Sequence, residues 1–414
     1  MMSYKRVCSR GLGIALFLIF YTINMSSQTA YITNSSGNTV TVIDVSTSMV
    51  LSTVNVGSYP FGVSVSPDGN WVYISNNGGN SVSVISTSDG SVAYTIAVGG
   101  NPDGIVVSQD GNKVYVANFG DGTVSVINAV SHSVSATINV GITPYGIAIS
   151  PDGSRVYVAN YSLNTIAVIS TSGDTVLTTI GVGNKPLGIA VSPDGTKVYV
   201  TNAVSNTVSV INSLTDTVSA TIIVGSSPYG VVFIPDGTKA YIANQGSDMV
   251  SVIDVAADTV LTTVAVGHGP VGISVSPDGS KVYTVNHEYN SVSVINTLVD
   301  TVLATVPVGV SPIGFGNFIS SYSISSGIIS HGFVSDGITI YPNPATTIMT
   351  FHSQLSTLNS QLLITDIMGN EVYKETINGI DNNIDISNLS NGVYFYQMNS
   401  EIGIVGKGKF VVIK

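Results

Sequence analysis

The residues best suited to metal chemistry are two histidines and a glutamate late in the sequence, His268, His287 and Glu288. Two imidazole nitrogens and a carboxylate oxygen could together ligate Zn²⁺ or another transition metal. Nothing in the sequence fixes their separation, and the pattern occurs once, so we interpret them as solvated loop residues and predict no metal site. The sequence also lacks Gly-x-Ser-x-Gly, His-Glu-x-x-His and Walker-type motifs. We therefore predict no catalytic residue and no bound cofactor.

A second group combines aromatic rings with one carboxylate. Each member directly follows a proline in a short segment that contains glycine, and the group comprises Phe61, Asp103, Tyr145 and Tyr229. Aromatic rings that meet on one face can stack on a sugar or another flat ligand. The alternative is packing against neighbouring segments, because aromatic side chains are often part of a core. Together with the histidines and the glutamate, these residues form our predicted ligand rim.

These residues belong to one unit that occurs seven times. A tyrosine, an asparagine three places later, a glycine, a proline and a second glycine all recur at intervals of 42 residues. The tyrosines are Tyr31, Tyr73, Tyr115, Tyr157, Tyr199, Tyr241 and Tyr283. Such a period identifies a repeat architecture and decides the fold. We assign the positions that recur in every unit to folding, so only the other positions can carry specificity.

Each unit is predicted to form four short β-strands. In the unit that begins at Tyr157 these are YVAN, TIAVIS, TVLTTIGVG and, after Pro186, LGIAVS. The turn Pro193-Asp194-Gly195 then leads to the next unit, and the recurring asparagine is expected to bond the backbone of a turn. Four strands in 42 residues are typical of a β-propeller blade, so the sequence predicts an all-β, seven-bladed propeller.

The order of the strands predicts how the ring closes. The first unit has three strands before its linker, whereas the last inner strand, Pro312–Ile319, lacks following partners. We therefore expect Pro312–Ile319 to complete the first blade, a three-plus-one closure that removes open sheet edges. In this arrangement the proline-containing linkers and the loops after each asparagine share one face. The predicted rim then lies at the mouth of the central channel, with Phe119, Tyr161 and Tyr289 on the same face.

The repeat motifs themselves resemble a known family. The strings YVAN, NTVSVIN, V-G-x-x-P-x-G and SPDG are similar to the YVTN-type β-propeller repeat of bacterial and archaeal surface proteins. The resemblance covers about residues 29–320. It implies a seven-bladed propeller of the surface-layer or binding type, and it says little about function because propellers host many activities.

The N-terminal residues 1–28 are predicted to be a secretory signal peptide. Lys5, Arg6 and Arg10 precede the apolar run Gly11–Tyr21, which is too short to span a bilayer. The single cysteine, Cys8, lies before that run and would be removed with it. The mature chain would then have no disulfide and no membrane span.

The C-terminal residues 338–414 depart from the 42-residue pattern. They follow a linker rich in serine and glycine, residues 321–337, and show short alternating strands that predict a small Ig-like β-sandwich. The segments Tyr341–Pro344, Asp366–Gly369, Gly392–Tyr394 and Gly406–Lys414 resemble the type A C-terminal sorting domain of type IX secretion in Bacteroidetes. The resemblance implies that the secretion machinery is a partner and that the protein passes through the periplasm to the outer cell surface or the medium. An ordinary binding sandwich is the alternative.

The composition narrows the remaining choices. Only 9% of the residues are charged and the net charge is −11, with 6 basic and 17 acidic residues in the propeller segment, so nucleic acid is not expected as a partner. We interpret the protein as a secreted, monomeric propeller that acts as a non-catalytic binding or structural module for a surface glycan or a protein. The alternative is a propeller enzyme of the lactonase, lyase or glycan-degrading type, with its site at the channel mouth.

Overall fold

The computed structural model describes residues 28–320, 338–341, 347–353, 360–366, 370–377, 381–400 and 403–412. The chain divides into two compact units, Met1–Ser325 and Ser326–Lys414, which are described separately below. The predicted signal peptide, apart from Gln28, and the predicted linker lie outside the described residues.

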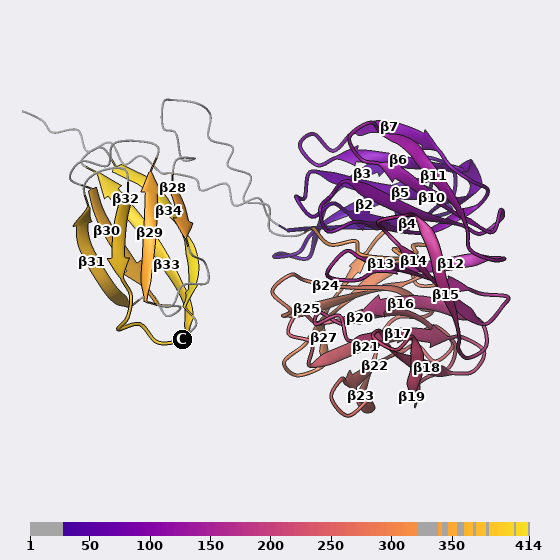
Figure 1. The fold of residues 1–414 in the computed structure, drawn as a ribbon. Coiled ribbons are helices and arrows are strands. Elements are labelled where there is room, and N and C mark those ends of the chain that lie inside the picture. The colour runs from indigo at the N-terminus through magenta and orange to yellow at the C-terminus, as the bar shows by residue number, and fades with distance from the viewer. Residues whose placement is uncertain are drawn as a thin grey trace, which may run out of the picture. The chain divides into compact units, whose positions relative to one another are not determined.

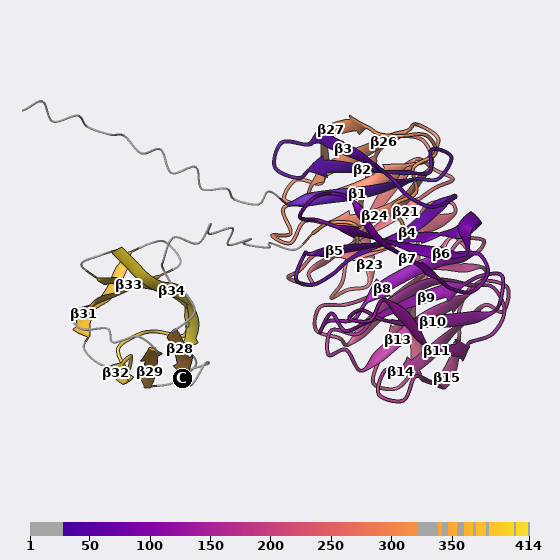
Figure 2. The same ribbon diagram turned by 90° about the horizontal axis from the view of Figure 1, so that it is seen from above.

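The first unit is a β-propeller of seven blades, as predicted (Figures 1 and 2). Each blade is an antiparallel sheet, and its strands follow one another in sequence from the channel outwards. Blade 1 contains β1 (Thr29–Asn34), β2 (Thr39–Asp44) and β3 (Met49–Asn55). Blade 2 contains β4 (Pro60–Val65), β5 (Trp71–Asn76), the short 3₁₀-helix η1 (Asn77–Gly79), β6 (Ser81–Ser86) and β7 (Val92–Ala97).

Blades 3 to 7 repeat the four-stranded pattern. Blade 3 contains β8 (Pro102–Val107), β9 (Lys113–Asn118), β10 (Thr123–Asn128) and β11 (Ser133–Asn139). Blade 4 contains β12 (Pro144–Ile149), β13 (Arg155–Asn160), β14 (Thr165–Ser170) and β15 (Thr175–Gly181). Blade 5 contains β16 (Pro186–Val191), β17 (Lys197–Asn202), β18 (Thr207–Asn212) and β19 (Thr217–Ile223). Blade 6 contains β20 (Pro228–Phe233), β21 (Lys239–Asn244), β22 (Met249–Asp254) and β23 (Thr259–Ala265). Blade 7 contains β24 (Pro270–Val275), β25 (Lys281–Asn286), β26 (Ser291–Asn296) and β27 (Thr301–Pro307).

The ring closes through residues 312–319, which confirms the predicted three-plus-one arrangement. The Ile313 N–H donates to the Thr33 carbonyl at 2.8 Å, and the Tyr31 N–H donates to the Phe318 carbonyl at 2.8 Å. The segment differs from the regular strand that we predicted, because it forms only isolated bridges with β1 and also accepts a bond from Val63 of blade 2. In Figure 2 the orange strands of blade 7 lie beside the indigo strands of blade 1, and the two blades share one core cluster.

Two of the recurring residues hold neighbouring strands at close range. A β-carbon added to Gly146 would lie only 1.9 Å from the Leu187 carbonyl oxygen of the next inner strand. A β-carbon on Gly183 would lie 2.6 Å from the side chain of the recurring Asn202. Both positions therefore require glycine because the space is already filled, and this accounts for their recurrence in every unit.

The recurring asparagine bonds mainly to side chains, which corrects our expectation that it would bond turn backbone. The Asn202 amide donates to Thr207 Oγ1 at 3.1 Å and to Ser209 Oγ at 2.9 Å, both on the next strand of its blade. In blade 4 the equivalent Asn160 does donate to a backbone carbonyl, that of Val140, at 2.8 Å. These bonds fix the second strand against the third near the end where the predicted rim lies.

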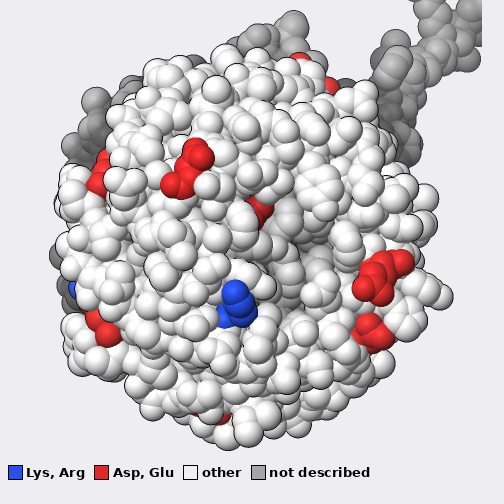
Figure 3. All heavy atoms as spheres, turned by 90° about the vertical axis from the view of Figure 1, so that its right-hand side faces the viewer, with Lys and Arg blue, Asp and Glu red and all other residues white. Residues whose placement is uncertain are grey.

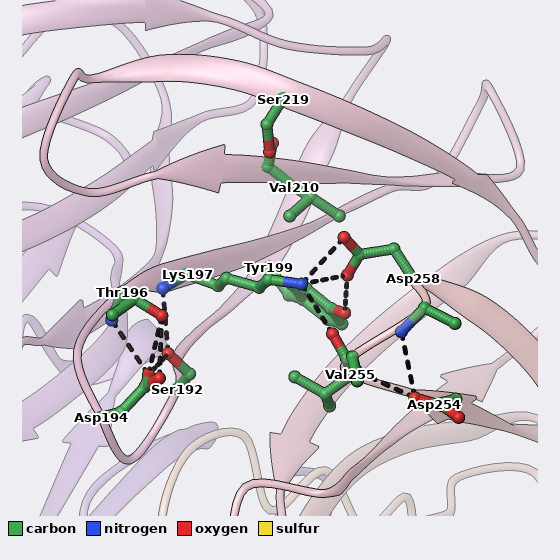
Figure 4. A network of polar contacts seen from close by, with 12 residues as sticks. Ser192, Asp194, Thr196, Lys197, Tyr199, Val210, Ser219, Asp254, Val255 and Asp258 are labelled. Carbon is green, nitrogen blue, oxygen red and sulfur yellow. Dashed lines mark hydrogen bonds and ion pairs between the residues drawn. The ribbon is translucent and has the colours of Figure 1, made fainter.

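The recurring basic residue and tyrosine connect adjacent blades. Lys197 Nζ lies 2.9 Å from Asp258 Oδ2 of the next blade and also donates to the Val255 carbonyl, while the Tyr199 hydroxyl donates to Asp258 Oδ1 at 2.5 Å (Figure 4). The same ion pair occurs at four blade junctions: Lys113–Asp174, Arg155–Asp216, Lys197–Asp258 and Lys239–Asp300. The turn aspartate is separate from this network, since Asp194 accepts bonds from Ser192 and Thr196 within its own turn.

The second unit consists of two antiparallel sheets. One contains β28 (Ile338–Tyr341), β29 (Ile348–Ser353) and β32 (Asp381–Asp385), and the other contains β31 (Glu371–Ile377), β30 (Ser360–Thr365), β33 (Gly392–Ser400) and β34 (Gly403–Val412). Buried side chains from both sheets form one core, which includes Phe351, Leu362, Ile364 and Met398. This is the small Ig-like sandwich that the alternating pattern predicted.

Candidate functional site

The two faces of the propeller carry different loops. The face with the proline-containing linkers and the loops after each second strand is called the upper face here, and the face with the Pro-Asp-Gly turns the lower face. Figure 3 shows the upper face, which has a hollow near its centre and few charged side chains around it. We call the ring of residues around this hollow the upper mouth. The inner strands of blades 2 to 7 begin there, each at its linker proline.

The structure brings together the three aromatic residues of the predicted rim, and they pack around a fourth ring. Phe61, Tyr145 and Tyr229 lie at the starts of β4, β12 and β20, and their ring centroids lie 5.5–5.9 Å from that of Phe315. The Tyr145 and Tyr229 hydroxyls are hydrogen bonded to each other. Burial raises the pKa of both tyrosines above its usual range, so both hydroxyls are neutral at physiological pH.

Phe315 comes from the closing segment and was not among the predicted residues. Its ring reaches across the channel, since a β-carbon on Gly146 of blade 4 would lie 3.3 Å from Phe315 Cζ. The flanking Gly314 and Gly316 have φ values of 55° and 120°, which other residues rarely adopt, and this backbone accompanies the irregular course of the segment. The sequence did hold a signal, because the equivalent position in the other six units is valine or isoleucine.

Asp103 occupies the same ring position in blade 3 and is only 3% exposed. Its carboxylate accepts one hydrogen bond from the Asn77 side-chain amide, which belongs to η1, at 2.7 Å. Burial without a cationic partner raises the pKa of Asp103 to about 7, although the Asn77 bond opposes that shift. Asp103 can therefore hold or release a proton near neutral pH.

A second layer of aromatic residues lies above Tyr145. The Phe119 and Tyr161 rings, from the loops after β9 and β13, each have their centroids 6.1 Å from that of Tyr145. Lys185 Nζ lies 4.3 Å from the centre of the Tyr161 ring, a cation–π contact. Both rings are half-buried, so they present part of their surface to solvent. The predicted ligand rim does not include this layer, although the repeat places Phe119 and Tyr161 on the same face as the rim.

The remaining rim residues lie in the loops of blade 7, and their side chains engage separate partners. His268 Nδ1 lies 2.7 Å from Asp248 Oδ2, whereas His287 Nδ1 lies 3.0 Å from the Pro312 carbonyl oxygen. Glu288 is joined to His268 through the backbone. Among the described residues, no three His, Cys, Asp or Glu side chains form a group that could hold a metal ion.

Another hollow, of about 770 Å³, lies on the lower face between the turns of blades 4 and 5. Its charged residues, Asp152, Arg155 and Asp194, occupy recurring positions and already bond within the fold. We assign this hollow to blade packing. The upper mouth is thus the place where residues that differ between units gather.

Comparison with protein families identifies the second unit. Residues 339–414 match the family model of the secretion system C-terminal sorting domain. The second unit is a sorting domain. It directs the chain to type IX secretion, and hence to the cell surface or the medium. In the described ranges no helix is long and apolar enough to cross a membrane.

The first unit is similar to two propeller families. Residues 64–152 match the YNCE-like β-propeller model, and residues 129–221 match the seven-bladed β-propeller lactonase model. The hydrazine synthase of Kuenenia stuttgartiensis has 26% sequence identity and a TM-score of 0.60, over 65% of this chain and 92% of that one. No curated protein gives a significant match.

Two further solved structures share the fold at lower identity. A protein of unknown function from Desulfotomaculum acetoxidans DSM 771 has 14% identity and a TM-score of 0.61, over 70% of this chain and 100% of that one. A proposed 6-phosphogluconolactonase from Bacteroides uniformis ATCC 8492 has 17% identity and a TM-score of 0.60, over 69% of this chain and 98% of that one. These similarities support the propeller fold next to the sorting domain.

Proposed function

We propose that the propeller is a non-catalytic binding module that the sorting domain delivers to the cell surface or the medium. The proposed order is a signal peptide (1–28), the propeller (29–320), a linker (321–337) and the sorting domain (338–414), in a monomeric chain. The ligand is a surface glycan or a protein segment that contacts the upper mouth.

The observation that carries the proposal is the chemistry of this mouth. Its floor consists of packed rings around Phe315, with a single buried carboxylate, Asp103. Hydrolytic enzymes instead place several polar groups where charge develops during the reaction. A partly exposed aromatic surface, formed here by Phe119 and Tyr161, favours stacking on a sugar ring or an apolar side chain.

The test uses glycan binding by variants of the loop rings, because truncating Tyr145 or Tyr229 would also disturb the packed floor. We expect Phe119→Ala and Tyr161→Ala each to weaken binding of an outer-membrane polysaccharide at least tenfold. Tyr289→Ala is the matched control, since Tyr289 is an exposed aromatic residue of the same face that contacts His268 instead of the mouth. Equal binding by all three variants would refute the proposed location.

A lactonase-type enzyme is the second candidate. It is favoured by the match of residues 129–221 to the lactonase model and by the pKa of Asp103, which suits a general acid or base. Hydrolysis of a panel of lactones and glycosides by the wild-type chain, and its loss in Asp103→Asn, would support the enzyme and overturn the non-catalytic proposal. No turnover above background in the wild-type chain would support the binding module.

A further inference from the structure

The lower half of the central channel contains a cavity that none of the functions above uses. Its volume is about 570 Å³, and all seven blades contribute to its lining. In each inner strand, one position two residues after the second recurring glycine of the repeat faces the cavity. Most blades have a small side chain at this position, such as Ser64, Ala148, Ala190 and Ser274. These small side chains leave the axis open, whereas β4 and β12 carry the larger Phe61 and Tyr145 nearer the upper face. We call this space the lower cavity.

The lower cavity is closed at one end and open at the other. Towards the upper face the channel is filled by Phe315, whose ring reaches from blade 1 to Gly146 of blade 4. Towards the lower face the lining extends to Pro67 and Pro277 in the Pro-Asp-Gly turns. A ligand would therefore enter from the lower face and stop beneath the aromatic floor.

The lining is apolar on one side and polar on the other, and none of the described residues that form it is charged. Blades 4 to 6 supply isoleucine, valine and alanine only, whereas blades 7, 1, 2 and 3 also supply polar residues. These are Ser274, Asn317, Ser64, Ser66 and Gln109. Ser274 Oγ donates to Asn317 Oδ1 at 3.1 Å, and Ser64 Oγ accepts from the Val107 N–H at 3.2 Å. The polar arc is thus partly organised by bonds within the protein.

We propose that the lower cavity binds an uncharged, mostly apolar small molecule that has hydrogen-bonding groups along one edge. Its volume lies within the range of about 300–1,000 Å³ typical of small-molecule sites, which combine apolar walls with a few placed polar groups. A charged ligand would lose its hydration without gaining an ionic partner here. The apolar arc offers water few partners, so an apolar ligand replaces poorly bonded water there.

The site is independent of the proposed function at the upper mouth. The aromatic floor separates the two, and no residue of the predicted rim lines the lower cavity. The two proposals can therefore fail separately, provided that the same preparations are tested with both kinds of ligand.

The experiment uses N-phenyl-1-naphthylamine, an uncharged dye that fluoresces in apolar surroundings, with the full chain. We expect saturable binding of one dye per chain, weakened at least tenfold by Ala190→Trp, which fills the cavity. Ala256→Trp adds the same ring to an exposed turn of the lower face and is expected to bind like the wild type. Tyr161→Ala, which alters only the upper mouth, is also expected to leave dye binding unchanged.

Two further measurements check that each variant is folded and that dye binding does not depend on charge. The circular dichroism spectrum and Tm of each variant report whether it is folded, and Ala148→Phe replaces Ala190→Trp if that variant does not fold. Raising NaCl to 1 M should change the affinity less than twofold, because no charged group lines the cavity. Unsaturable dye binding, equal affinity in folded Ala190→Trp or Ala148→Phe, or a strong salt dependence would overturn the proposal.

Discussion

The two faces of the propeller differ in how much the repeated positions vary from blade to blade. On the lower face, four junctions pair a lysine or arginine with an aspartate at the same repeat positions, with nitrogen to oxygen distances of 2.7–2.9 Å. On the upper face, one ring position holds phenylalanine, aspartate, tyrosine, leucine, valine or isoleucine, depending on the blade. Positions that recur in most blades hold the ring together, whereas the positions that differ give the upper mouth its own chemistry.

Some junctions on the lower face lack this ion pair, and they show which contacts take its place. At the junction of blades 2 and 3, Trp71 and His132 occupy the positions of the cation and the aspartate, with ring centroids 5.6 Å apart. Tyr94 stacks on His132 with centroids 3.7 Å apart. At the closing junction Lys281 Nζ keeps the recurring bond to a backbone carbonyl, that of Val45, at 2.9 Å, but Ser48 stands where four other blades have aspartate. Both aromatic and ionic contacts can therefore join blades.

The largest effect is expected where the upper ends of neighbouring inner strands meet. Gly146→Ala would place a methyl group 1.9 Å from the Leu187 carbonyl oxygen, so the backbone must shift. We expect a loss of about 3 kcal/mol or more in the free energy of unfolding, measured by urea denaturation. Gly181→Ala is the matched control, because an added β-carbon there meets nothing within 4 Å. Similar losses in the two variants would contradict this account.

The next largest effect is a pH-dependent change in stability caused by Asp103, the buried carboxylate of the upper mouth. The pKa of Asp103 is raised to about 7 when folded, so the native state binds an extra proton between about pH 4 and pH 7 and loses stability as pH rises through that range. Asp103→Asn removes this titration. We expect it to stabilise the protein on the order of 3 kcal/mol at pH 8 and by almost nothing at pH 4.

Thermal or urea unfolding at both pH values checks the Asp103 prediction, and each variant serves as its own control at the other pH. A stability difference between Asp103→Asn and the wild type that is the same at pH 4 and pH 8 would contradict the raised pKa.

A smaller effect tests the recurring contact of the lower face. A double-mutant cycle of Lys197→Ala and Asp258→Ala should give a coupling energy of about 1 kcal/mol, because both groups are partly exposed but share bonds with Val255 and Tyr199. The coupling should decrease in 1 M NaCl, as measured by urea unfolding. A coupling near zero at low salt would show that the recurrence of this pair has another cause.

The smallest effect is expected from a substitution that restores the recurring ion pair at the closing junction. Ser48 has φ of 58°, close to the values of 49–54° found for the aspartates of the four ion pairs. Ser48→Asp should therefore present a carboxylate to Lys281 and stabilise the protein by about 0.5 kcal/mol. Gly90→Asp is the control, since Thr29 stands where a lysine would be needed. A larger gain in Gly90→Asp than in Ser48→Asp would contradict the ionic explanation.

The period of 42 residues was sufficient to predict the blades and the closure, because a repeat that cannot bury its strands alone must pack against its neighbours. The ion pairs were missed because Lys197 and Asp258 are 61 positions apart, and only the ring brings them together. Two of the seven recurring units lack the cation, which weakened the pattern further.

The upper mouth was predicted only in part. The linker prolines placed Phe61, Tyr145 and Tyr229 on one face, but spacing along the chain does not specify which rings meet across a channel. Phe315 was overlooked because it lies at a recurring apolar position, where its size is the only distinguishing property. The partners of His268 and His287 depend on side-chain directions that a loop sequence does not determine.

The closing segment also sets an order of events for a chain made from its N-terminus. Gly314 N–H donates to Thr33 Oγ1 across 281 positions of sequence, so blade 1 lacks its inner partner until almost the entire propeller has been synthesised. The Ser320 N–H then bonds the Thr29 carbonyl at 2.9 Å. A protease that cuts beyond Ser320 leaves these closing bonds in place. The sorting domain can therefore be removed after export without opening the ring.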